Sequence, residues 1–308
     1  RDKAAMMERE QVVWNGRVAP MGTMCQEFLL KVYGRRTYHG LTATQVMCSM
    51  TLRPEEWSAQ PLIKVGRGEY RSFASFVDYS SMPPRLKDVD KADGKVREKV
   101  GLMLMLMQGT LFTEVPAEGH RLSASRVSAE LLYNSTDWTL LCMASAFVLA
   151  LLLVLSTLRR TQWCAVPAGM LHGALALLLT LLLGVRWYIA DHIPLSNGYE
   201  TMLFVSFCLT CGTLLVGRTR VRAFGALATA FMLLVAHLGE INPQITSLMP
   251  VLHSPWLSAH VSIIMVSYAL LALSMVERSL LRPAVFCLAA GLHAGRGHSR
   301  CSWQGCPR

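Results

Sequence analysis

The chain has 308 residues, of which 52% are hydrophobic and only 16% are charged, and its mean hydropathy is +0.35. This composition argues against an ordinary soluble domain and predicts a membrane protein. The formal net charge is +10. Nucleic-acid binding is nevertheless not expected, because the arginines of the second half fall in short loops rather than along one face beside aromatic side chains.

The charge is unevenly distributed along the chain. Residues 1–137 contain 19 basic and 16 acidic side chains, whereas residues 138–308 contain 11 arginines, no lysine and 4 acidic side chains. We therefore expect a mainly α-helical protein in which a smaller soluble, extracytoplasmic domain, residues 1–137, precedes a polytopic helical membrane bundle of five to six spans, residues 138–276. Residues 277–308, rich in Arg, Gly and Cys, are expected to form an atypical tail.

The first domain carries two local signals. Asn15-Gly16 in "WNGRVAP" is typical of a tight turn. It is followed by apolar residues with helical spacing, namely Met24, Phe28, Leu29 and Val32. The apolar run "LMLMLMQGTLF" at 102–112 is too short to span a bilayer, so it is expected in a core or at an interface.

Five apolar segments then have the length that a bilayer requires, roughly 20 residues each. They are residues 138–158, 164–190, 199–217, 222–239 and 257–276. A sixth, starting at Pro283, is short.

The loops between these segments alternate in charge, which predicts their orientation. Arginines gather at 159–160, 218–222 and 278–282, while the other two loops carry chiefly Asp191, Glu200 and Glu240. Under the positive-inside rule, the arginine loops are cytoplasmic and residues 1–137 lie on the outer face. Arg186, near an outer helix end, runs against this trend and is interpreted as a snorkelling cation.

The histidines are the main candidates for chemistry. His192 and His260 are expected at outer ends of spans, where a neutral imidazole can ligate a metal or haem iron. The alternative is a hydrogen-bonded interfacial histidine. Trp256 lies one helical turn before His260, on the same face. His253 is either a second ligand or a solvent-facing loop residue.

Other polar residues have structural interpretations. His172 and His237 are expected to face the bundle. Cys208 and Cys211 form a CxxC inside a span, where a redox thiolate is not expected. In "HIPLSNGYE", Asn197 and Glu200 have the spacing of a capping box. Residue patterns alone thus predict a polytopic protein with a histidine site on its outer face, and no reaction.

Two stretches, "HIPLSNGYETMLFVSFC" and "EINPQITSLMPVLHSPWLSAHVSIIMVSYALL", resemble the CcsA/ResC family of cytochrome c biogenesis proteins. In that family a P-L-S-N-x-Y-E segment opens one span, and an I-N-P loop followed by W-L-x-x-H-V opens a later one. The matching residues here are 194–200, 241–243, 256–261 and 267–270. Larger bacterial relatives also have an extracytoplasmic portion similar to the "WNGRVAP" region.

The resemblance implies a system II component of the bacterial cytoplasmic (inner) membrane that binds haem b transiently and delivers it for covalent attachment to apocytochrome c. It places the candidate axial ligand of the haem iron at His260, with Trp256 beside it. It also implies membrane lipid and a ResB-type partner or fused segment as partners, within a cytochrome c haem lyase system.

This chain departs from the family pattern after Glu277. The tryptophan-rich loop and later histidines of the family do not follow here, so we expect a truncated site that is not active alone. His293 and His298 match nothing in the family. A transporter, or a scaffold whose histidines are all structural, remains the alternative to haem delivery.

Overall fold

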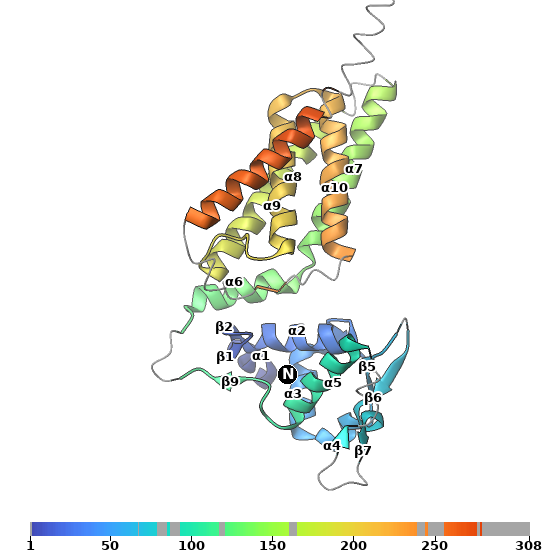
Figure 1. Cartoon of the computed structure of the whole chain (residues 1–308), viewed down its shortest axis with the longest axis vertical. Helices are drawn as coiled ribbons and strands as arrows, with labels where there is room; N and C mark the ends of the chain where they lie inside the picture. Colours follow the sequence, from blue (N-terminus) through green and yellow to red (C-terminus); the bar gives the residue numbers. More distant parts are fainter. Residues whose placement is uncertain are drawn as a thin grey trace, which may run out of the picture. The chain divides into compact units, whose positions relative to one another are not determined.

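The computed structural model describes residues 2–66, 68–78, 85–86, 93–116, 121–159, 165–238, 244–245, 256–275 and 278. Contacts group the chain into two compact units (Figure 1). The first unit comprises Arg1–Thr136 with Gln244–Ser247, and the second comprises Asp137–Pro243 with Leu248–Arg308. Helices dominate both units, which confirms the mainly α-helical class.

The first unit combines six helices with short strands. Its helices are α1 (Asp2–Met7), α2 (Met21–Tyr33), α3 (Ala43–Leu52), α4 (Pro54–Ser58), α5 (Gly94–Met107) and α6 (Ala124–Ser135), with a 3-10 turn at Phe73–Phe76. Its strands are β1 (Gln11–Trp14), β2 (Arg17–Pro20), β3 (Thr37–Tyr38), β4 (Leu41–Thr42), β5 (Pro61–Lys64), β6 (Tyr70–Ser72), β7 (Val77–Asp78), β8 (Arg85–Leu86) and β9 (Thr113–Glu114).

The predicted turn at Asn15-Gly16 joins β1 and β2. Both residues have positive φ, 50° and 75°, as a two-residue hairpin turn with the twist of the strands requires. The strands pair antiparallel with Trp14 opposite Arg17, and β9 pairs with the other edge of β1. The hairpin therefore fixes the position of Arg17, the first residue of β2.

Helix α2 forms the centre of the first unit's core. Its four residues with helical spacing, Met24, Phe28, Leu29 and Val32, are each at most 1% exposed, which confirms the expected helix. Met103 and Leu106 of α5 belong to the same core. The part of the apolar run 102–112 that lies in α5 thus contributes to the core, as expected.

Among its described residues, the second unit contains five helices long and apolar enough to cross a membrane. They are α7 (Trp138–Arg159), α8 (Ala165–Ala190), α9 (Gly198–Val216), α10 (Thr219–Leu238) and a last helix, Trp256–Met275. Their ends agree with the predicted spans to within three residues. The sixth expected span, from Pro283, lies outside the described residues.

The first four of these helices pack as a ring. Helix α10 packs on α7 and α9, and α8 packs on the same two helices. A side chain at Gly225 of α10 would collide with Thr213 of α9, so glycine allows these two helices to approach closely. The last helix lies on α9 through Ala269 and Leu273, which contact Leu209 (Figure 1).

Successive membrane spans run in alternating directions. The start of α7, the α8–α9 loop, the end of α10 and the start of the last helix therefore belong to one end of the spans. We call it the N side, because α7, the first span, begins there. The start of α8 and the α9–α10 turn belong to the opposite side.

Candidate functional site

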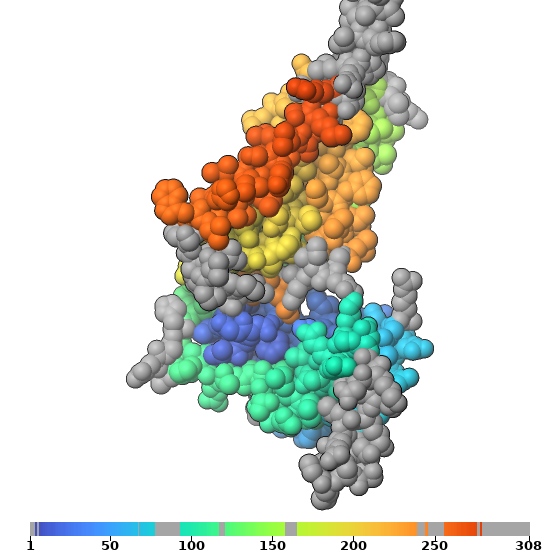
Figure 2. All heavy atoms as spheres, viewed as in Figure 1, coloured from blue at the N-terminus to red at the C-terminus, as the bar shows by residue number. Residues whose placement is uncertain are grey.

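His260 and Trp256 lie in the first turns of the last helix, on the N side. Trp256 is 85% exposed and His260 is also exposed. Among the described residues, neither ring nitrogen of His260 has a hydrogen-bond partner. The last helix is the least buried of the five spans, and its outward face is visible in Figure 2. His260 is therefore an unengaged imidazole one helical turn from an indole.

Two further histidines lie on the N side, and each has an interaction of its own. His192 is partly buried, and its Nδ1 lies 3.1 Å from the carbonyl oxygen of Ile193. His237, at the end of α10, places Nδ1 4.0 Å from Oδ1 of Asp137. His253 lies outside the described residues. The N side thus presents His260 as a more available imidazole than His192 or His237.

His172 faces the bundle, as predicted, on the half of α8 nearer the opposite side. It is 1% exposed, and its Nε2 lies 3.0 Å from the carbonyl oxygen of Thr210. Its Nδ1 accepts a hydrogen bond of 3.0 Å from Nε of Arg222. Because a guanidinium can only donate, Nδ1 carries no proton and Nε2 is the donor to Thr210. His172 is therefore a neutral structural residue whose lone pair is already used.

Arg186 does not snorkel, so that interpretation is wrong. Its side chain is fully buried, and Nη2 donates to Oε1 of Glu200 over 2.8 Å, with Nε 3.2 Å from the same oxygen. The guanidinium carbon also lies 5.0 Å from the centre of the Tyr199 ring. A carboxylate and an aromatic face are available inside the bundle, and they replace the solvation that snorkelling would provide.

Glu200 forms only half of the predicted capping box. Asn197 accepts a hydrogen bond of 2.9 Å from the Glu200 amide, as an N-cap residue does. The Glu200 carboxylate does not return to Asn197; Oε2 instead accepts from the amide and the hydroxyl of Ser196, over 2.8 and 2.7 Å. Glu200 thus joins the end of α8, the loop and the start of α9.

These buried polar contacts continue into α7, because Thr139 shares a hydrogen bond with the hydroxyl of Tyr199. Sequence reasoning noticed Arg186 and Glu200 separately and missed that they pair. The available signal was two opposite charges flanking one short loop between adjacent spans. Their ion pair joins the two ends of the segment that carries His192.

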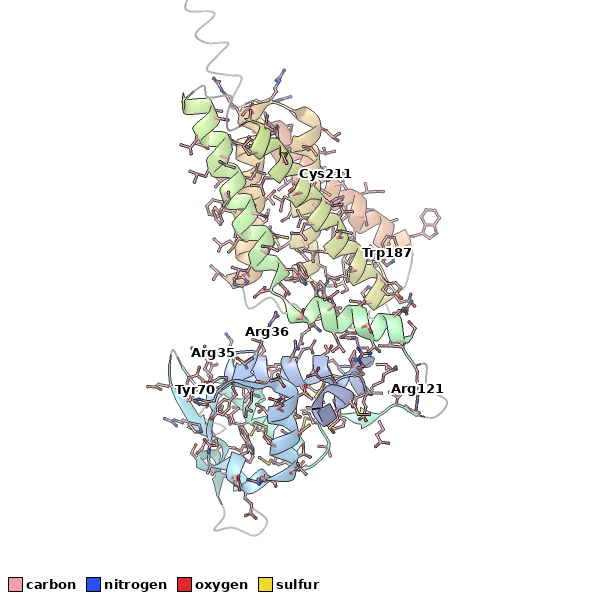
Figure 3. All side chains as sticks on the ribbon, turned by 180° about the vertical axis from the view of Figure 1, so that it is seen from behind. Arg35, Arg36, Tyr70, Arg121, Trp187 and Cys211 are labelled. Atoms are coloured by element: carbon pink, nitrogen blue, oxygen red, sulfur yellow. The ribbon has the colours of Figure 1, made fainter. Side chains whose placement is uncertain are left out.

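The two cysteines of α9 do not form a disulfide bond. Cys208 and Cys211 are both free, and Figure 3 shows Cys211 within the bundle. In the described part of the chain, no three His, Cys, Asp or Glu side chains gather as a metal-ligating group. Both cysteines of the CxxC pair lie within α9.

Known proteins share these segments. The family of cytochrome C assembly proteins matches residues 195–279. Protein NrfI of Wolinella succinogenes is 27% identical over 82% of this chain and 38% of its own length. CcsA of Prochlorococcus marinus strain MIT 9301 is 38% identical over 34% of the chain and 36% of its own length, and CcsA of Synechococcus sp. strain CC9311 is 38% identical over 40% and 39%.

Over these segments the chain is similar to the CcsA/ResC family of cytochrome c biogenesis proteins. The part shared with the family runs from Leu195 through α9 and α10 to the last helix, so it includes Glu200, Trp256 and His260. The chain spans about two fifths of the length of the relatives it matches. The apolar helices of its described residues, together with this similarity, support a multi-pass membrane protein.

Proposed function

We propose that this chain is a haem-handling component of cytochrome c maturation, which binds haem at the N side of the membrane and presents it to apocytochrome c. The observation that carries the proposal is His260, an exposed imidazole without a hydrogen-bond partner among the described residues. It lies in the family segment, at the membrane-entering end of an apolar helix.

The chemistry of this side chain fits haem iron. A neutral imidazole nitrogen is an axial ligand of haem iron in many proteins. Trp256 offers a flat apolar surface one turn away, suited to the face or edge of a porphyrin. Haem is the substrate here: a cysteine thiol of apocytochrome c adds across each vinyl group, so that a carbon–sulfur bond forms and the thiol proton moves to the neighbouring vinyl carbon.

The other N-side histidines are weaker candidates on the same argument. His192 has its Nδ1 at the Ile193 carbonyl, and His237 lies beside Asp137. His172 is excluded from ligation in this conformation because Arg222 occupies its lone pair. His260 is therefore assigned as the axial ligand, with Trp256 as its neighbour in the site.

The cellular setting is part of the proposal. The membrane is the bacterial cytoplasmic (inner) membrane, and the N side is its outer face, because the arginine-rich turns then lie inside. Residues 1–137 form the extracytoplasmic domain and residues 138–276 the membrane domain. A ResB-type partner or fused segment completes the assembly, and the haem is haem b.

A reduced-minus-oxidised absorbance spectrum of the detergent-purified chain, expressed with haem supplied, tests this function. We expect a haem band that is reduced at least several-fold by His260→Ala and retained by His237→Ala, the matched N-side control. Equal retention in the two variants would remove His260 as ligand. Pyridine haemochrome analysis of the extracted pigment is expected to give the spectrum of haem b, with both vinyl groups unreacted.

A further inference from the structure

Three sulfur atoms lie together where α1, α2 and α3 pack in the first unit. The thiol of Cys48 on α3 donates to Sδ of Met7, the last residue of α1, over 3.4 Å. On α2, the thiol of Cys25 is hydrogen-bonded to Thr44, which lies one helical turn before Cys48 on the same face of α3. Cys48 also acts electrostatically on the Cys25 thiol. The two thiols therefore share the α2–α3 interface, beside the thioether of Met7.

The packing of the three helices holds these side chains in place. Both α1 and α2 pack on α3. A Cβ added at Gly22 of α2 would lie 3.3 Å from the side chain of Glu8, so the chain at the end of α1 also approaches α2 closely. Cys25 is 1% exposed, whereas Cys48 and Met7 are partly buried. The sulfur group is thus shielded at Cys25 and accessible to solvent at Cys48 and Met7.

The surroundings of the two thiols disfavour a thiolate and favour a cation. Burial is the largest cause of the rise in the pKa of Cys25 to about 12, and the charges of Cys48 and Glu8 raise it further. Burial also raises the pKa of Cys48, and Glu10 adds to this rise. At neutral pH both cysteines are therefore protonated and poor nucleophiles for disulfide exchange. The same carboxylates attract a positive ion.

The types of donor atom decide which ion fits. Thiolates and thioethers are soft ligands, and together they select Cu(I). Zinc sites draw their ligands, usually four, from cysteine, histidine and carboxylate side chains. Within the described residues, no third His, Cys, Asp or Glu completes a metal-ligating group with these cysteines. Two thiols and one thioether therefore fit a Cu(I) ion of low coordination number.

We propose that Met7, Cys25 and Cys48 form a three-sulfur binding site for Cu(I). On binding, the two S–H bonds break, two copper–thiolate bonds form, and the Met7 sulfur donates a lone pair. Two protons pass to solvent and no electron is transferred. The bound ion links α1, α2 and α3 and so stabilises the folded first unit. This site is separate from haem handling and does not depend on the proposed function.

An anaerobic Cu(I) titration of the detergent-purified full chain, with bicinchoninate as competing chelator, tests the site. We expect one Cu(I) per chain at this site, and Cys25→Ser or Cys48→Ser is expected to lower its affinity about 100-fold or more. Met7→Leu, which replaces only the thioether, is expected to lower the affinity about tenfold. These substitutions nearly preserve side-chain volume, and circular dichroism checks that each variant is folded.

The matched control is Met105→Leu, because Met105 is 48% exposed on α5 and lies outside the sulfur group. Its Cu(I) affinity is expected to equal that of the parent. Cysteines elsewhere in the chain are separated by site-resolved mass spectrometry of the unmodified protein. One equivalent of Cu(I) is expected to protect Cys48 from alkylation, and Met7→Leu is expected to weaken this protection.

Thermal unfolding gives a further measurement that needs no haem. Cu(I) is expected to raise the Tm of the parent and of Met105→Leu, but not that of Cys25→Ser or Cys48→Ser. Alkylation of Cys48 at an equal rate with and without Cu(I) would overturn the site. Unchanged Cu(I) affinity in both serine variants would overturn it as well, and preferential binding of Zn(II) at the same residues would overturn the choice of metal.

Failure of this proposal leaves haem binding at His260 untouched, because none of these measurements involves haem.

Discussion

Arg186 and Glu200 form an ion pair in which both side chains are fully buried, at the point where α8 leaves and α9 enters the membrane. A buried pair does little for stability compared with a well-packed apolar pair, but removing one partner strands the other charge. The pair therefore makes the local structure depend on both residues together.

Arg186→Ala or Glu200→Ala is expected to lower the free energy of unfolding by about 3–5 kcal/mol. The double variant Arg186→Met/Glu200→Leu is expected to regain most of that loss, because no charge stays behind. Denaturation of the detergent-solubilised chain, followed by circular dichroism, measures both. Breaking the exposed pair Arg53–Glu56 is the control and should change stability by less than about 1 kcal/mol. Single variants with the same free energy of unfolding as the parent would contradict the burial of the pair.

The cap of α9 gives a second, smaller effect. Asn197→Ala removes the acceptor of the Glu200 amide and is expected to cost about 1 kcal/mol. Asn197→Asp keeps an oxygen acceptor in the same place and is expected to be close to neutral. The same denaturation experiment compares the two, and an equal loss in both would show that the cap is not the cause.

Glu27 makes the first unit sensitive to pH. Burial is the largest cause of the rise in its pKa to about 7, opposed by the hydrogen bond from Trp14. Since the folded-state pKa is raised above the ordinary 4.5, the folded state binds the proton more tightly, and stability falls as pH rises from about 4.5 to about 7. The full difference is roughly 3 kcal/mol.

Glu27→Gln is expected to remove this part of the pH dependence, because the amide is neutral and still offers an oxygen to Trp14. The measurement is thermal unfolding of the full chain between pH 5 and pH 8, with the variant compared to the parent at each pH. Parallel curves for the two proteins would contradict a titration of Glu27 in this range.

His172 and His260 are expected to separate stability from haem binding. His172→Ala leaves Nε of Arg222 without its acceptor and removes one of the donors to the Thr210 carbonyl, which is expected to cost about 2–3 kcal/mol. The haem bound per folded chain should stay unchanged. His260→Ala should do the reverse, since its exposed ring stabilises nothing among the described residues. Thermal unfolding and haem content, measured on the same samples, check both halves.

Topology is tested by reporter fusions. Fusions after Arg160 and Arg220 are expected to report the cytoplasm, and a fusion after Gln244 the outer face, because four spans separate residue 137 from residue 239. The opposite pattern would reverse the assignment of the N side and move His260 to the cytoplasmic end.

Much of the architecture was accessible from the sequence. Span length, set by bilayer thickness, located five helices to within three residues, and the 3.6-residue period identified α2 through Met24 and Phe28. The tight turn followed from Asn15-Gly16, since these residues adopt positive φ readily. The motifs around Pro194 and Trp256 indicated the family, although the role of His260 stays a prediction.

Only the tertiary structure shows which residues pair when their local sequence does not specify a partner. Arg186 looked like a lone cation because its preferred environment depends on Glu200, which the α8–α9 loop brings beside it. His172 was expected to face the bundle, but its partner there, Arg222 of α10, could not be read from the sequence. Arg17 and Ile245 meet across 228 residues. Periodicity and propensity act within one helix or turn, whereas these contacts depend on how separate elements pack.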